Sequence, residues 1–374
     1  MGALSHLRVL DLSTVLAGPG CARHLADFGA DVIKVERPGA SDSARTMGWR
    51  DPIDGQSLFS KSANRNKRCI ELDLTSEQGH RRLLQLVATA DVLIENMRPG
   101  KLEALGLGPE VLLAVRPSLV IARITAFGQD GPYKDRPGFA TLAEAMSGFA
   151  GLNGAAAGAP TLPPIALTDE VTALAAAFAV LVAVQSGVGQ VVDVNLLESL
   201  LQLMGPLPTL WLQSGILQPR LGSGLPYTAP RGTYLCSDDT WVAVSTSADS
   251  VADRVMKLIG LDGDRRVVSG EARMENREFL EERLTQWIGV RTSAEVLEAF
   301  LTADAACAPI YDMEQLCSDE HVRARGIIVE ADGYPMTGPV ARLSATPAEI
   351  GWPGRPAGTD TAEVLAELDA GDRS

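Results

Sequence analysis

The N-terminal segment 7–36 reads LRVLDLSTVLAGPGCARHLADFGADVIKVE. Two short apolar runs, 7–12 and 31–36, flank a loop with two glycines and a helical stretch that ends near Asp27. A strand, a helix and a second strand in this order predict a βαβ unit. Helical and strand patterns alternate again up to residue 124, so the sequence predicts an α/β fold in which helices lie on the faces of a parallel sheet.

The second half of the chain departs from this alternation. Five prolines and five glycines fall within 205–232, which predicts an irregular linker. A hairpin pattern and amphipathic helices follow in 233–318 and indicate a smaller α+β domain. More prolines precede a last helix in 319–374. Two long irregular connections are unusual in a compact monomer, and they favour segments that wrap a partner subunit.

Composition narrows the class of protein. The chain has 374 residues and a formal net charge of -14, which argues against nucleic acid and anionic membrane partners because these are bound through clustered Lys and Arg. The five cysteines are odd in number and widely spaced, so neither a disulfide framework nor a zinc site is predicted. The apolar stretch 171–184 is short for a bilayer span and is predicted to be a buried core helix. A cytoplasmic protein without a signal peptide or a metal is expected.

Motifs of several enzyme classes are missing. The loop after the first strand offers Gly18 and Gly20 of a dinucleotide fingerprint, but Arg23 stands at the third glycine position. A tight turn without a ligand explains these glycines, and an NAD enzyme is disfavoured. The sequence contains no serine-hydrolase elbow, Walker loop or zinc-protease motif, and its four histidines are scattered.

A small set of cations stands out in this acidic chain: Arg65, Lys67 and Arg68 in one cluster, and Arg37, Arg98 and Lys101 elsewhere. Such side chains bind the phosphate groups of ligands such as CoA. A solvated charged face is the alternative, and the residues alone leave both open.

Asp169 closely precedes the apolar stretch and therefore lies where a helix is predicted to begin. An acid at this place satisfies free backbone amides as a cap or first-turn residue. The helix N-terminus would also keep the carboxylate ionised and ready to attack an electrophile. The two roles are compatible.

Ordered motifs run along nearly the whole chain, at 8–12, 17–19, 29–37, 66–68, 91–96, 127–133, 187–194, 229–232 and 323–326. Together they resemble the class III CoA-transferases, which include formyl-CoA transferase and carnitine CoA-transferase and are related to α-methylacyl-CoA racemase. The resemblance implies a large Rossmann-like domain built from both chain ends, here 1–204 and 319–374, with a smaller domain between them. It also implies an interlocked homodimer in which each subunit threads a ring formed by the other.

The resemblance also implies a site. Asp169 matches the catalytic aspartate of the family. The positions that match its CoA-binding residues are Val15, Ala17, Arg37, Leu72, Asn96, Met97, Arg98 and Phe139. Ala104 stands where many members carry an arginine, so contacts with the CoA phosphates are expected to rest more on Arg98 and Lys101.

The implied reaction moves CoA from an acyl-CoA donor to a carboxylic acid. The Asp169 carboxylate attacks the thioester to give a mixed anhydride and CoA thiolate. The thiolate then forms an aspartyl-CoA thioester, which the incoming acid opens. Backbone amides around Gly222 and Gly224 would shelter the anhydride and stabilise its oxyanion.

Two alternatives to transfer remain. A racemase needs two acid-base groups, and Phe139 and Ala248 stand where the related racemase has a histidine and a glutamate, which favours transfer. The other alternative is a CoA-binding protein without catalysis, because a fold does not guarantee a function.

Overall fold

The computed structural model describes residues 2–39 and 42–371, and it divides into two compact units. Of the described residues, the first unit consists of 2–39, 42–149, 162–205 and 321–371, and the second of 150–161 and 206–320. Each unit has its own hydrophobic core. Both ends of the chain therefore belong to the same unit.

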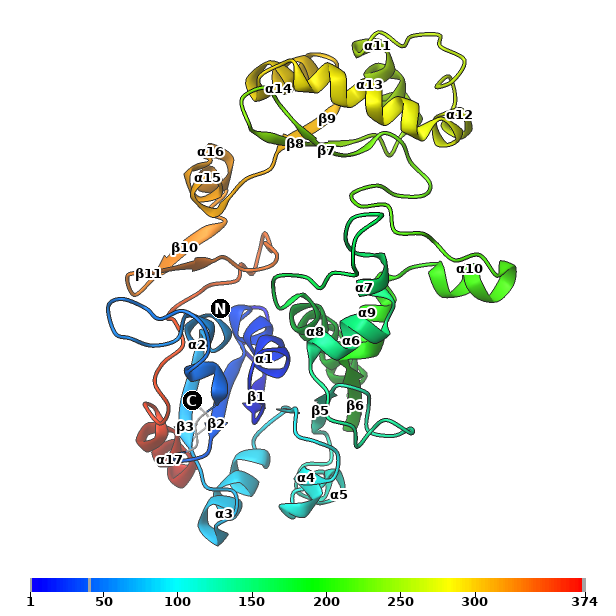
Figure 1. The fold of residues 1–374 in the computed structure, drawn as a ribbon. Helices are drawn as coiled ribbons and strands as arrows, with labels where there is room; N and C mark the ends of the chain where they lie inside the picture. The colour runs from blue at the N-terminus through cyan, green and yellow to red at the C-terminus, as the bar shows by residue number, and fades with distance from the viewer. Residues whose placement is uncertain (1, 40–41, 372–374) are drawn as a thin grey trace. The chain divides into compact units, whose positions relative to one another are not determined.

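A six-stranded parallel sheet forms the centre of the first unit. Its strands are β1 (Arg8–Asp11), β2 (Asp31–Glu36), β3 (Lys67–Glu71), β4 (Val92–Glu95), β5 (Val120–Thr125) and β6 (Gln190–Asn195). Their spatial order is β3-β2-β1-β4-β5-β6, so β1 and β4 are neighbours. Figure 1 labels β3, β2 and β1 toward one end of this sheet and β5 and β6 toward the other. This is the strand order of a Rossmann fold, and it confirms the predicted Rossmann-like sheet. Ligands of such sheets bind outside the carboxyl ends of the strands where the order reverses, here between β1 and β4.

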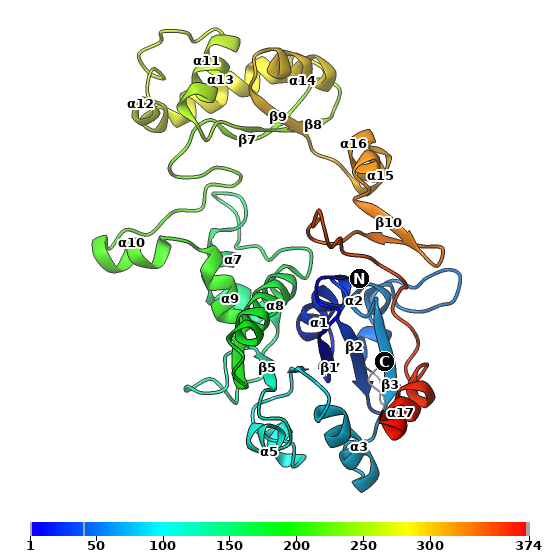
Figure 2. The ribbon, with the colours of Figure 1, turned by 180° about the vertical axis from the view of Figure 1, so that it is seen from behind.

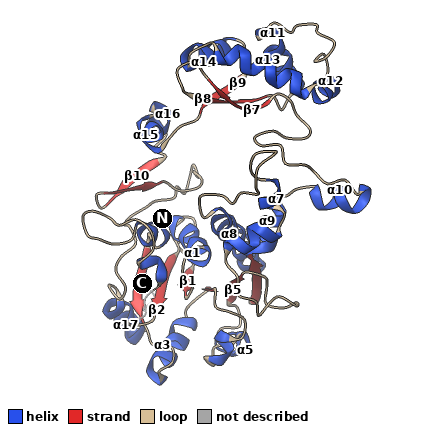
Figure 3. Ribbon diagram, viewed as in Figure 1, coloured by secondary structure: helices blue, strands red, loops and turns tan. Residues whose placement is uncertain are grey.

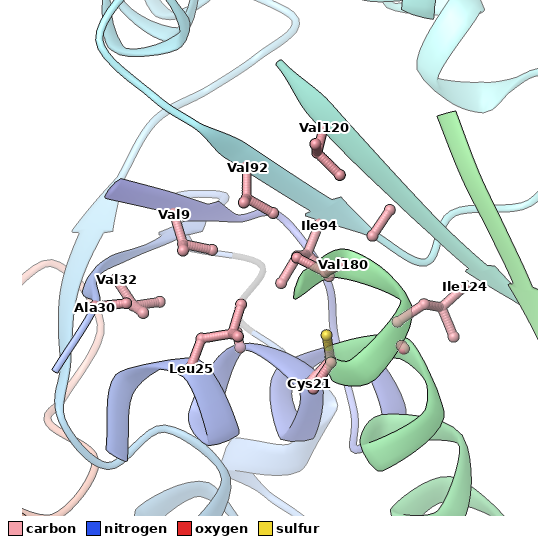
Figure 4. Close-up of a cluster of buried hydrophobic side chains, with 14 of the residues drawn as sticks. Val9, Cys21, Leu25, Ala30, Val32, Val92, Ile94, Val120, Ile124 and Val180 are labelled. Carbon is pink, nitrogen blue, oxygen red and sulfur yellow. The ribbon is translucent and has the colours of Figure 1, made fainter. Parts of the chain in front are cut away.

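Helices cover both faces of this sheet, because successive strand residues point to opposite sides. Val9 and Val92 point to the face covered by α1 (Ala17–Asp27) and α8 (Leu167–Ser186). Figure 4 shows the apolar side chains of these strands and helices meeting in one cluster. Leu10 and Leu93 point to the other face. That face is covered by α3 (Glu77–Val87), α4 (Lys101–Ala104), α5 (Pro109–Val115) and α17 (Thr361–Ala370).

Two glycines allow α1 to pack closely. A Cβ added at Gly20 would lie 2.8 Å from the Cβ of Ala173 in α8, and one at Gly18 would lie 2.3 Å from the Cβ of Ser13. Both glycines are inside the first turn of α1, so the expected tight turn before the helix is wrong. Close helix packing explains the glycines instead.

The apolar helix α8 is only half buried, although the sequence predicts a buried core helix over 171–184. Ala173 and Val180 are buried, whereas Leu174, Val182 and Phe178 are exposed, the last at 72%. Among the described residues, α8 is the one helix long and apolar enough to cross a membrane by length and composition. The other face of α8 packs on α1 and the sheet. Length and composition alone do not reveal this packing.

The C-terminal segment completes the first unit. A hairpin of β10 (Ile328–Ala331) and β11 (Tyr334–Thr337) interrupts the expected return linker, and Arg65 Nη1 donates to Thr337 O at 2.5 Å. The last helix, α17, lies beside β3 in both views (Figures 1 and 2). Asp360, just before α17, accepts a hydrogen bond from Cys69 N of β3 at 2.7 Å. The shorter remaining elements of this unit are η1 (Ser43–Arg45), α2 (Leu58–Ala63), α6 (Ala140–Met146), α9 (Leu196–Leu203) and α16 (Glu320–Ala324). Helix α7 (Phe149–Leu152) belongs, except for its first residue, to the second unit.

An antiparallel sheet with helices forms the second unit (Figure 3). Its strands are β7 (Arg231–Leu235), β8 (Trp241–Ser245) and β9 (Ala306–Pro309), in this spatial order. Its helices are α10 (Leu207–Ser214), α11 (Asp249–Leu258), α12 (Gly270–Glu275), α13 (Arg277–Gly289), α14 (Ser293–Thr302) and α15 (Met313–Ser318). The hairpin of β7 and β8 confirms the pattern seen in the sequence.

The segment 205–232 is not irregular throughout, because it contains α10. Pro206 precedes this helix and Pro208 lies in its first turn, where the backbone N–H has no helical partner in any case. Gly215 ends the helix with a left-handed backbone at φ 67°. The prolines and this glycine mark the ends of a helix, so the expected uninterrupted linker is wrong.

Candidate active site

The carboxyl edge of the parallel sheet gathers most of the predicted CoA-binding residues. Val15 follows β1, Arg37 follows β2, Leu72 follows β3 and Asn96 follows β4. The Asn96 side chain accepts a hydrogen bond from Thr14 N at 2.8 Å and donates one to Thr14 O at 2.7 Å. The loops after β1 and β4 are therefore tied together at the place where the strand order reverses.

A cavity of about 250 Å³ opens at this edge. Three predicted residues, Arg37, Leu72 and Met97, line it. Its other wall combines apolar side chains such as Val35 and Leu105 with acids such as Asp73, and Arg37 is exposed. Apolar walls with a cation suit a ligand that combines an organic body with phosphate groups, as CoA does.

A buried acid shapes the loop that leads into α1. Val15 has a left-handed backbone, with φ 69°, and its N–H donates to Asp42 Oδ1 at 2.9 Å. Asp42 Oδ2 accepts a hydrogen bond from the buried Lys34 Nζ at 3.3 Å. Ala17 is buried at the start of the helix. Asp42 also lines the cavity, so it positions a loop of the site although the sequence did not single it out.

A second, smaller cavity of about 70 Å³ adjoins the first, since Met97 lines both. Asn96 and Arg98 line it together with Lys134 and Arg136, which come from the segment after β5. Three cations around one opening suit phosphate groups. Lys134 and Arg136 were not predicted. Their place just after a predicted strand, at the edge where ligands bind, is the signal that would have found them.

The other predicted CoA-binding residues lie at helix starts. Lys101 begins α4 and is exposed. Ala104 ends the same short helix and supplies no charge there. Phe139 directly precedes α6 and is 69% exposed, so it offers an aromatic face to a ligand. Lys101 and Phe139 line neither of the two cavities.

The cations at 65–68 are buried or half-buried and are paired with acids of the first unit. Arg65 pairs with Asp27 at 2.6 Å, and Arg68 pairs with Asp31 at 2.8 Å. Lys67 is fully buried and contacts an acid of β1 at 2.8 Å. Both interpretations from the sequence are wrong, because these cations neutralise acids inside the first unit.

Asp169 is the third residue of α8 and so lies where the sequence placed it. Its side chain is partly buried and has no hydrogen bond among the described residues. Ala166 occupies the N-cap of α8, without a side-chain cap. Asp169 is therefore a first-turn acid, one of the two structural roles expected for it, and it is not the N-cap.

Two further acids lie beside Asp169. Glu144 of α6 is buried and accepts a hydrogen bond from Thr168 Oγ1 at 2.9 Å. Glu170 pairs with Arg23 of α1 at 2.8 Å. Burial first, and then the charges of Glu170 and Glu144, raise the pKa of Asp169 to about 6. Lost hydration and two like charges therefore act against the helix N-terminus, which favours the ionised form. A carboxyl with a pKa of about 6 is still mostly ionised at neutral pH.

Gly222 and Gly224 belong to the second unit, in the loop before β7. The N–H of Gly224 donates to Leu221 O at 3.0 Å and is not available to an oxyanion. In the part of the chain that the structure describes, the N–H groups of Gly222 and Ser223 have no protein acceptor. These two amides are the ones that the loop offers to a ligand.

A metal site is not evident in 2–39 and 42–371, where no three His, Cys, Asp or Glu side chains gather closely enough to hold an ion. A reaction without a resident metal stays a prediction.

Comparison with known proteins gives matches along nearly the whole chain. The profile of CoA-transferase family III matches residues 4–361. A succinyl-CoA–D-citramalate CoA-transferase of Chloroflexus aurantiacus is 36% identical, over 98% of this chain and 94% of the relative. A succinate–glutarate CoA-transferase of Agrobacterium fabrum is 33% identical, over 99% of this chain and 97% of the relative.

The solved structures agree with these matches. A CAIB/BAIF family protein from Brucella suis superimposes with a TM-score of 0.87 and 30% identity, over 98% of this chain and 100% of that protein. The match in sequence therefore extends to the fold that carries the edge site. This chain belongs to CoA-transferase family III.

Proposed function

We propose that this chain moves CoA from an acyl-CoA donor to a carboxylic acid, with Asp169 as the covalent nucleophile. The observation that carries the proposal is a carboxylate in the first turn of α8 that has no hydrogen bond or ion pair among the described residues and a raised pKa. The relatives named above act with succinyl-CoA or succinate, which makes succinyl-CoA the donor of choice for a test.

The proposed reaction balances without a reductant, a metal or ATP. An Asp169 carboxylate oxygen adds to the thioester carbonyl, and the carbon–sulfur bond breaks to release CoA thiolate and leave a mixed anhydride. The thiolate adds to the Asp169 carbonyl and expels the donor acid, which gives an aspartyl-CoA thioester. The acceptor carboxylate repeats the two steps in reverse, so acyl-CoA and a free acid exchange partners and Asp169 is regenerated.

Transfer and racemisation are separated by one experiment. Donor acyl-CoA is incubated with an isotope-labelled acid in deuterated water, and both products are read by mass spectrometry. Label in the CoA ester without deuterium at the α-carbon supports transfer, whereas deuterium without label supports a racemase. If neither product forms, the remaining alternative is a protein that binds CoA without catalysis.

We predict that activity follows the ionisation of Asp169. Because its pKa is raised to about 6, kcat/KM is expected to rise with pH through this value and to level off above it. Glu144→Gln removes one of the charges that raise the pKa and keeps an oxygen for Thr168 Oγ1. The acidic limb of the profile is then expected to move to lower pH. Glu110→Gln, at an exposed acid of α5, is the matched control. An unmoved limb in Glu144→Gln contradicts this assignment.

The cations of the smaller cavity give a second prediction, on CoA binding. Arg98→Ala and Lys134→Ala are each expected to raise the KM for the CoA ester about tenfold, since each removes a charged hydrogen-bond donor from phosphate. The effect is expected to shrink in high salt. Arg81→Ala, at an exposed arginine of α3, should leave this KM unchanged. If the KM of Arg98→Ala and of Lys134→Ala equals that of Arg81→Ala, the CoA phosphates bind elsewhere.

The interlocked homodimer and the cytoplasmic location remain parts of the proposal. The exposed apolar stripe of α8, with Leu174, Phe178 and Val182, supports burial of this face in an assembly. Light scattering in solution tests the dimer, and a mass of one subunit would refute it.

A further inference from the structure

The sheet of the second unit has one covered and one open face. Tyr234, Val242 and Val244 point into the core beneath α11, α13 and α14, which lie on one side of the sheet (Figure 1). On the open face, Arg231 of β7 stands opposite Ser245 of β8. The residues around this pair are small, namely Thr233, Ala243, Ala306 and Ala308.

These small side chains leave a cavity of about 670 Å³. Arg231 is the one charged residue among those that line it. The guanidinium has no acidic partner in the described residues, although the chain carries a net charge of -14. Its one protein hydrogen bond there is to Ser223 O, through Nη1. A cation with spare donors and no acid beside it is suited to a small anion.

The cavity shares a wall with the glycine loop of the same unit. Gly222 and Ser223 line it, and they carry the two amides that have no protein acceptor among the described residues. The resemblance to the CoA-transferases implies that this loop stabilises the oxyanion of the reacting carbonyl. A ligand that reaches from the loop to Arg231 would therefore have an acyl group at one end and an anionic group at the other.

We propose that this cavity binds the second carboxylate of a dicarboxylic acid, with Arg231 as the residue that selects dicarboxylates over monocarboxylates. The inference rests on the proposed function, because it names the substrate class of that reaction. A guanidinium binds a carboxylate through two parallel hydrogen bonds, and a methyl group at the same place leaves it unpaired. Asn153, Thr233 and Ser245 supply further polar groups to the lining.

The test compares two acids of equal length, glutarate and valerate, as CoA acceptors at saturating succinyl-CoA. The wild-type enzyme is expected to favour glutarate in kcat/KM. Arg231→Gln is expected to reduce the ratio of glutarate to valerate at least about tenfold through the KM for glutarate, the size of a lost charged hydrogen bond. Arg231→Lys retains the charge and should restore part of the preference.

A second variant separates the charge of Arg231 from its contact with the loop. Ser245→Asp places an acid opposite Arg231 on the next strand and leaves the donor to Ser223 O in place. The same loss of preference for glutarate is expected. Arg254→Gln removes a cation from α11 in the same unit and should not alter the ratio.

The outcomes distinguish this inference from the proposed function. An unchanged ratio in Arg231→Gln, or a wild-type enzyme that does not prefer glutarate, overturns the role of the cavity and leaves the transferase intact. Full turnover of Asp169→Asn with either acid overturns the proposed mechanism whatever the ratio. No transfer by the wild-type enzyme to any acid overturns both.

Discussion

Asp169→Asn is expected to lower kcat for CoA transfer by at least about 10³-fold, because it removes the oxygen nucleophile on which both covalent intermediates depend. Asparagine has nearly the same volume, and Asp169 makes no side-chain hydrogen bond among the described residues, so α8 should keep its structure. Mass spectrometry of the enzyme after incubation with acyl-CoA checks the chemistry directly. The wild-type peptide that contains Asp169 should carry CoA, and the variant peptide should not.

Two measurements make this result specific. The residues that line the two edge cavities do not include Asp169, so the affinity of the variant for CoA should stay close to the wild-type value. Glu170→Gln is the matched control, since it alters the neighbouring acid and keeps the nucleophile. Because it removes a charge that raises the pKa of Asp169, kcat should be compared well above pH 6, where it should stay close to the wild-type value. Turnover of Asp169→Asn within about tenfold of the wild type would show that another group carries the reaction.

Much of the edge site follows from the sequence because it depends on local order along the chain. In a parallel sheet whose strands are each followed by a helix, the carboxyl ends of all strands lie at one edge. Residues just after the strands, such as Val15, Arg37 and Asn96, therefore come together. The place of Asp169 in a first turn follows in the same way from the apolar helix behind it.

Features that depend on contacts between distant segments were not predictable in this way. The cations at 65–68 looked available because their acidic partners lie in α1, β1 and β2. The raised pKa of Asp169 depends partly on Glu144, which another helix brings to its side. Helix α10 was missed because proline breaks a helix in its interior but is tolerated in its first turn. The sequence pattern did not reveal that Pro208 lies in a first turn.

Asp11 holds together the buried charges under the site. It ends β1 and is completely buried, as are Lys34 and Lys67. Its carboxylate accepts hydrogen bonds from Lys67 Nζ at 2.8 Å and Ser13 N at 3.0 Å, and it lies 3.9 Å from Lys34 Nζ. Burial works to raise the pKa of Asp11, but the two lysines outweigh it and hold this pKa below its usual value.

Asp11→Ala is therefore expected to lower the free energy of unfolding of the first unit by about 3–5 kcal/mol, the cost of leaving buried charge uncompensated. Lys34 would keep the carboxylate of Asp42 at 3.3 Å, whereas Lys67 would keep the uncharged oxygens of Pro19 and Asn64 as its partners. Urea unfolding, followed by hydrogen–deuterium exchange of peptides from 7–36, measures the loss of stability in the segment that contains Asp11. Asp369→Ala, which removes an exposed partner of Arg82, should leave the transition nearly unchanged.

The same variant is expected to weaken CoA binding, because the cluster also fixes the backbone of the site. Lys34 Nζ contacts Ser13 O and Asp42, and Asp42 in turn accepts the N–H of Val15. A lysine released from Asp11 would draw on those same acceptors and shift the loop after β1. Calorimetric titration with CoA, well below the unfolding temperature, should give at least about a tenfold higher Kd. An unchanged Kd in a destabilised variant would mean that the loop keeps its shape without the buried carboxylate, and that Asp42 alone positions it.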